Sequence, residues 1–131
     1  MTSRWTWKAG AILLLAGATA ASAQRLTEMY IPIGKSPGLS GKHTLIGTIS
    51  AVDATARRIT CSGEAGSTTV QVTERTRIWL DRTPAKLANL KGTLSDCRVG
   101  RRMEAKYVNN ERKPGAEAEW IKVEVSAPEA R

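Results

Sequence analysis

The sequence contains no phenylalanine, one histidine and two cysteines, and aromatic residues make up 5% of its 131 residues. So few aromatic side chains leave little surface on which the bases of a single-stranded nucleic acid could stack, and such a partner is not expected. Any Ser-His or Cys-His catalysis would need His43, which lies in a glycine- and lysine-rich stretch with no acid beside it to orient the ring. The sequence therefore predicts no enzyme.

Motifs for cofactors and metals are also lacking. Gly34-Lys35-Ser36 resembles the end of a phosphate-binding loop, but Met29 stands where that motif requires glycine. There is no C-x-x-C pair, and no spacing supports a copper site formed by Met29, His43 and Met103. We therefore expect neither a cofactor nor a metal.

No hydrophobic run is long enough to span a membrane, which takes roughly 20 apolar residues. The run 9–23 is shorter, follows a start that carries Arg4 and Lys8, and ends in Ala21-Ser22-Ala23. A basic start, an apolar centre and a small-x-small end are the three parts of a secretory signal peptide. We interpret residues 1–23 as a cleaved leader and predict a periplasmic or secreted protein that does not span the membrane after cleavage.

The two cysteines, Cys61 and Cys97, both lie after this leader. In an oxidising compartment an isolated pair most often forms a disulfide bond, and we predict one here. A redox pair or half of a metal site is the alternative.

From Thr44 onward, short stretches of apolar and β-branched residues alternate with turn-forming residues, a pattern typical of half-buried strands. Leu45, Ile49 and Ala51 are expected to share the inner face of the first strand. The expected strands are 44–52, 57–62, 67–73, 76–81, 101–108 and 117–125, with one or two helical turns over 84–90. This order predicts a mainly β protein with an OB-like Greek-key barrel of five to six strands and one short helix at 44–125. Another small β-barrel or sandwich is the alternative.

The segments on either side of this domain have a different composition. Residues 24–43 contain several glycines and prolines and little periodicity, which predicts an extended arm or linker with few backbone hydrogen bonds. The last residues, 126–131, are predicted to form a flexible tail.

The chain resembles a group of small exported bacterial OB-like β-barrel domains of unknown function. The resemblance rests on apolar and turn positions between Leu45 and Val125, such as Gly47-x-Ile49-x-x-Val52-Asp53, Asp96-Cys97-x-Val99-Gly100 and Trp120-Ile121-x-Val123. In that group, aliphatic core residues usually fill the positions of Cys61 and Cys97. The departure implies a disulfide across the barrel interior, whereas the resemblance itself implies no chemistry.

Positive charge is in excess, with 20 Lys and Arg against 12 Asp and Glu, and the basic residues cluster in pairs. Arg57-Arg58 and Arg112-Lys113 fall in the loops that flank the usual binding face of an OB-fold, so we expect them to form one patch. The sequence thus predicts an exported, non-enzymatic binding module for an anionic envelope component or a protein partner. Alternatives are a structural or stress-related envelope protein without a specific ligand, a redox or metal accessory protein, or an enzyme.

The predicted leader generates a direct test. N-terminal sequencing of the exported protein should begin at Gln24, because the small-x-small pattern ends at Ala23. Recovery of the uncleaved chain from the membrane fraction would contradict this prediction.

Overall fold

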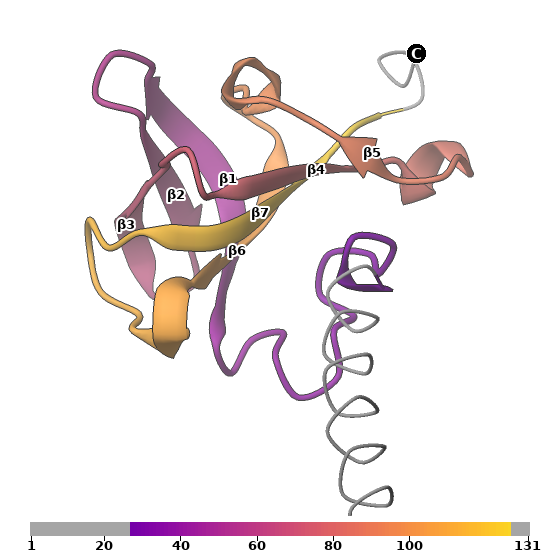
Figure 1. Ribbon diagram of the computed structural model, residues 1–131, viewed down its shortest axis with the longest axis horizontal. Helices are drawn as coiled ribbons and strands as arrows, with labels where there is room; N and C mark the ends of the chain where they lie inside the picture. The colour runs from indigo at the N-terminus through magenta and orange to yellow at the C-terminus, as the bar shows by residue number, and fades with distance from the viewer. Residues whose placement is uncertain (1–26, 127–131) are drawn as a thin grey trace, which may run out of the picture.

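A computed structural model describes residues 27–126, so the predicted leader and most of the predicted tail lie outside the described residues. The described chain forms one seven-stranded sheet in the order β3-β2-β1-β6-β7-β4-β5 (Figure 1). No helix among residues 27–126 is long and apolar enough to cross a membrane. The strands are β1 (Thr44–Asp53), β2 (Arg58–Gly63), β3 (Gly66–Gln71), β4 (Arg77–Asp81), β5 (Leu90–Lys91), β6 (Arg102–Tyr107) and β7 (Ala118–Glu124).

The sheet closes on itself because β3 and β4 behave as one bent strand. β3 pairs with β2, whereas β4 pairs in parallel with β7. A bridge between Gln71 and Glu117 joins the two halves, supported by a hydrogen bond from the Gln71 amide to the Ala116 carbonyl at 2.9 Å. With this closure the connections are those of an OB-like barrel, which confirms the predicted fold class.

Apolar residues from every long strand fill the barrel interior. They alternate along the strands as the period of two requires, and Met103, Tyr107 and Ile121 are among the largest fully buried side chains. The remaining members of the core are Leu45, Ile49, Ile59, Cys61, Val70, Val72, Ile78, Cys97, Ala105, Ala118 and Val123.

Two expectations about local structure are wrong. The register of β1 against β2 shifts between Ile49 and Ala51, so Val52 packs against the core and Ala51 is exposed. The predicted helical turns over 84–90 are a single 3-10 turn, η1 (Thr83–Ala85), followed by β5. Lys86 ends that turn in the left-handed region at φ 58°, which stops the helix before the spacing of Leu87 and Leu90 can form an apolar face. Two further 3-10 turns are η2 (Leu94–Asp96) and η3 (Val108–Asn110).

Residues 27–43, which we call the arm, fold into turns that pack on the outer face of β4, β6 and β7 (Figure 1). Three charged residues of that face, Asp81, Glu104 and Lys122, are buried and bind the arm. The arm is therefore not the loosely held extended segment that its composition predicts. Prolines and glycines that disfavour a strand still permit turns whose amides reach buried carboxylates.

The contacts between arm and barrel are polar. The amides of Ile33 and Gly34 each donate at 2.9 Å, to Asp81 Oδ2 and Glu104 Oε1 respectively. Lys122 Nζ donates to Glu28 Oε1 at 2.7 Å and to the Ile31 carbonyl at 2.9 Å. Ser36 adds a hydroxyl to this cluster, and its Oγ donates to Glu28. These contacts neutralise a lysine whose side chain is 1% exposed.

The buried ion pair generates a stability prediction. Glu28→Gln should lower the free energy of unfolding by about 3 kcal/mol, because it leaves the charge of Lys122 buried without a counter-charge. Urea denaturation measures the loss. Glu119→Gln is the matched control, since Glu119 pairs with Lys106 at 3.1 Å but its side chain is 47% exposed, and such pairs contribute about 1 kcal/mol or less. Equal losses in the two variants would contradict the structural role of the arm.

Candidate functional site

The structure does not bring the four predicted binding residues together. Arg57 and Arg58 lie where β2 begins, and their guanidinium groups hold the end of β3. Arg57 Nε donates to the Val72 carbonyl at 3.2 Å, and Arg58 Nε donates to Gln71 Oε1 at 3.0 Å. These contacts give the first basic pair a structural role.

Arg112 and Lys113 lie at the opposite end of the β2–β3 hairpin. There they line a hollow of about 630 Å³ with the β2–β3 turn and the start of β1, which we call the turn hollow. The prediction of a single four-residue patch is therefore wrong. The β6–β7 loop hydrogen-bonds along β3, with the Gly115 amide on the Thr69 carbonyl at 3.0 Å, and so reaches the turn rather than the β1–β2 loop.

Cys61 and Cys97 are free thiols, so the predicted disulfide is wrong. Both are buried in the core, but their neighbours differ. Cys61 lies against Gly47, and its charge when ionised raises the pKa of Tyr107. Cys97 lies before β6 begins, where the charges of Asp96 and Arg101 affect the pKa of its thiol. The two thiols are not bonded to each other, and both side chains serve as core residues.

Burial also governs the chemistry of these thiols. It raises the pKa of Cys61 from 9.0 to about 11 and, with the nearby charge of Asp96, raises that of Cys97 to about 12. Both cysteines are thus protonated at neutral pH, and a protonated thiol is a poor nucleophile and a poor metal ligand.

The three residues considered for copper do not converge. Met103 is fully buried inside the barrel, whereas His43 is exposed at the end of the arm and the Met29 carbonyl accepts from Asn89 at 3.0 Å. Within residues 27–126, no three His, Cys, Asp or Glu side chains are placed to hold a metal ion.

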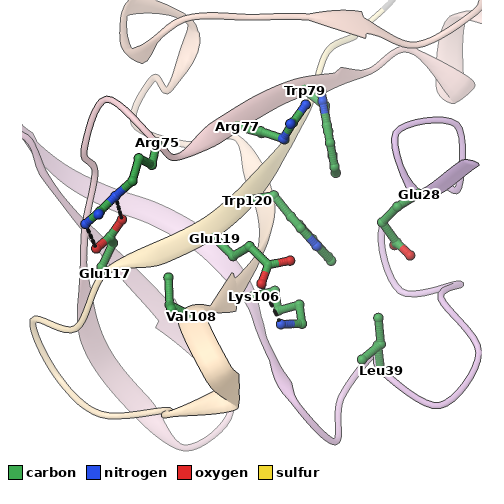
Figure 2. A pocket seen from close by; sticks show the side chains of 10 residues that line it. All are labelled: Glu28, Leu39, Arg75, Arg77, Trp79, Lys106, Val108, Glu117, Glu119 and Trp120. Carbon is green, nitrogen blue, oxygen red and sulfur yellow. Dashed lines mark hydrogen bonds and ion pairs between the residues drawn. The ribbon is translucent and has the colours of Figure 1, made fainter. Parts of the chain in front are cut away.

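A larger hollow of about 670 Å³ lies between the arm and the outer face of the sheet; we call it the arm hollow. Figure 2 shows Glu28 and Leu39 of the arm facing Trp120 and Lys106 of the sheet. Strands β4, β6 and β7 supply most of the wall because alternate residues of each strand point outward. The full lining is Glu28, Leu39, Arg75, Arg77, Trp79, Lys106, Val108, Glu117, Glu119 and Trp120.

Two tryptophans form the apolar part of this wall. The ring centroids of Trp79 and Trp120 are 5.7 Å apart at an angle of 32°, and Lys122 Nζ lies 4.7 Å from the centroid of Trp120. The two residues are only 5% and 3% exposed. The rings therefore offer little open surface for stacking.

All but one of the charged side chains around the arm hollow are paired. Arg75 binds Glu117 at 2.8 Å, Lys106 binds Glu119 at 3.1 Å, and Glu28 binds Lys122. The hydroxyl of Thr73 and the guanidinium of Arg75 lower the pKa of Glu117, which keeps this carboxylate ionised. Arg77 is exposed, and its side chain has no hydrogen-bond or ion-pair partner among the residues that the structure describes.

The sequence contains a pattern that indicates this site, but the search for adjacent basic residues did not reveal it. Arg77 and Trp79 are two apart in β4, as are Trp120 and Lys122 in β7, so each pair shares one face of its strand. Their position on the outward face follows from the inward positions of Ile78 and Ile121. The missing information was that the arm would cover this face and make it concave.

No protein-family model matches the chain, and no curated protein matches it. Among solved structures, the Cu(II) form of a tryptophan-to-alanine variant of CusF from Escherichia coli is similar, with 12% identity and a TM-score of 0.42, covering 61% of this chain and 88% of that one. The Ag(I) form of CusF has 14% identity and a TM-score of 0.41, covering 61% and 93% respectively. Similarity at this level transfers no residue or ligand to this chain.

The free thiols generate two linked predictions. Without reductant, the folded protein should resist alkylation, and unfolding alone should make both cysteines reactive, because no disulfide protects them. A chain that stays unlabelled after unfolding and is labelled only after reduction would show that the disulfide exists.

Stability should also decline at alkaline pH. The folded chain keeps thiol protons that the unfolded chain loses, so this contribution is complete below pH 9.0 and is lost as the pH rises toward about 11 and 12. Urea unfolding at about pH 8 and about pH 10.5 measures the decline. The double variant Cys61→Ala/Cys97→Ala should decline less, and Tyr107, whose pKa burial also raises, should account for part of the remainder. An equal decline would contradict the assignment to the thiols.

Proposed function

We propose that the protein is a non-enzymatic binding module that holds a polar ligand with one acidic group, such as an acidic oligosaccharide of the cell envelope, in the arm hollow. The observation that carries this proposal is Arg77. An exposed guanidinium without a partner, beside neighbours that are all paired, offers a fork of donors to a carboxylate from outside the chain.

Size and lining support the same conclusion. A volume of about 670 Å³ falls within the range of about 300–1,000 Å³ that is usual for small-molecule sites. Apolar atoms of Trp79, Trp120 and Leu39 alternate with the paired carboxylates and cations of the wall. A ligand with both apolar ring faces and hydroxyl groups fits such a mixed wall, because each kind of group finds a matching surface.

The chemistry of the lining favours binding over catalysis. A general acid needs a raised pKa, whereas the pKa of Glu117 is lowered by Thr73 and Arg75. His43 is exposed and is not among the lining residues of the arm hollow. The groups around the hollow are therefore arranged to hold charge in place and not to transfer protons.

Tryptophan fluorescence of residues 24–131 provides the test, because Trp79 and Trp120 are then the only tryptophans and both line the arm hollow. Titration with a uronic-acid trisaccharide should change the emission, and a neutral trisaccharide should bind more weakly. Arg77→Gln should weaken binding of the acidic probe about ten- to a hundredfold, as expected for loss of a charge-assisted hydrogen bond.

Arg112→Gln is the matched control, since it removes the same charge from a residue that lines the turn hollow and not the arm hollow. Equal weakening in the two variants would show that binding depends on the net charge of the protein and not on Arg77. Absence of any fluorescence change would favour a structural protein without a specific ligand.

A further inference from the structure

The turn hollow is lined in part by residues with small side chains. Glycine, alanine and serine contribute six of its fourteen lining residues, among them Gly63, Gly66 and Ser67 of the β2–β3 turn. Where side chains are this small, a ligand can approach main-chain amides closely. Ser67 and Thr68 add hydroxyl groups that can donate hydrogen bonds.

The β6–β7 loop is fixed in place over this hollow. The Gly115 amide donates to the Thr69 carbonyl at 3.0 Å, and the Ala116 amide donates to the Lys113 carbonyl at 3.1 Å. On the other side, Asn109 and Asn110 occupy the left-handed region at φ 56° and 57°, a conformation uncommon for residues other than glycine. This bend directs Arg112, Lys113 and Pro114 toward the hollow.

The charge of the turn hollow is positive and not neutralised internally. Arg112 and Lys113 are exposed, and within residues 27–126 neither side chain has a hydrogen-bond or ion-pair partner. Glu64, at the tip of the turn, is the one acid in the lining.

We propose that the turn hollow is a second, independent binding site, which takes the oxyanion of a phosphate or sulfate ester. Arg112 presents a planar fork to two oxygens of the group, and Lys113 adds a point charge. Hydroxyls of Ser67 and Thr68 and the small-residue turn complete the surroundings of the anion. The arm hollow differs because it offers one free cation and a largely apolar wall.

Amide NMR spectra of residues 24–131, titrated with inorganic phosphate and separately with a heparin-derived hexasaccharide, test this site and distinguish the two sources of oxyanion. Both probes should shift the amides of 63–68 and 112–115, and with inorganic phosphate the shifts should be confined to these residues. Arg112→Gln and Lys113→Gln should each weaken binding at least about fivefold, and the double variant should abolish it. Both side chains are exposed, so an unchanged spectrum without ligand confirms that the variants fold.

Arg77→Gln is the matched control and should leave these shifts unchanged. Added salt should weaken binding, since the site depends on exposed charges. Shifts that spread equally to Arg57 and Arg58, shifts that survive the double substitution, or no shift with either probe would each overturn the proposal.

Discussion

Three charged side chains buried on the outside of the barrel determine how the rest of this structure is built. Asp81, Glu104 and Lys122 project from β4, β6 and β7, respectively, on the face that a free-standing barrel would expose to water. Burial of an unpaired charge costs several kcal/mol, so each requires partners that water no longer provides. The arm supplies most of them through amides, the Ser40 hydroxyl and Glu28, and Thr44 of β1 adds a second hydroxyl to Glu104. Barrel and arm are therefore one cooperative unit.

The arm hollow is a consequence of this polar attachment. An apolar strap would pack flat on Trp79 and Trp120, because dispersion contacts favour the closest fit. Hydrogen bonds at fixed points along the arm instead leave space between these points, and the hollow lies there (Figure 2). Within the lining of the arm hollow, Arg77 differs from the other charged side chains, which are paired.

Alternation of apolar residues was sufficient to predict the barrel. The expected strand at 117–125 and the observed β7 agree closely, because inward positions such as Ile121 and Val123 follow a period of two. The bulge in β1 was not predictable, since a shift of register depends on cross-strand pairing and leaves no pattern within one strand. The prediction of a disulfide was wrong for a similar reason. Two buried cysteines satisfy the same hydrophobic pattern whether or not their sulfur atoms meet.

The sites were less predictable than the fold because they depend on contacts between distant segments. Basic pairs are visible in the sequence, but the side of the barrel that each occupies depends on how the β6–β7 loop is pinned along β3. The arm was interpreted from its glycines and prolines alone, and its partners lie 48 to 94 residues further along the chain. Contacts between residues so far apart in the sequence leave no pattern within a single segment.

That separation has a consequence for the order in which the chain can assemble. Glu28 and Lys122 are 94 residues apart, so the first described segment finds its counter-charge in the last strand to leave the ribosome. A shorter chain that ends before β7 lacks this counter-charge, although Asp81 and Glu104 are already present, and contacts of high sequence separation form slowly. The pair of Glu28 and Lys122 can therefore form only after β7 has been synthesised, so the attachment of the arm is completed late in folding.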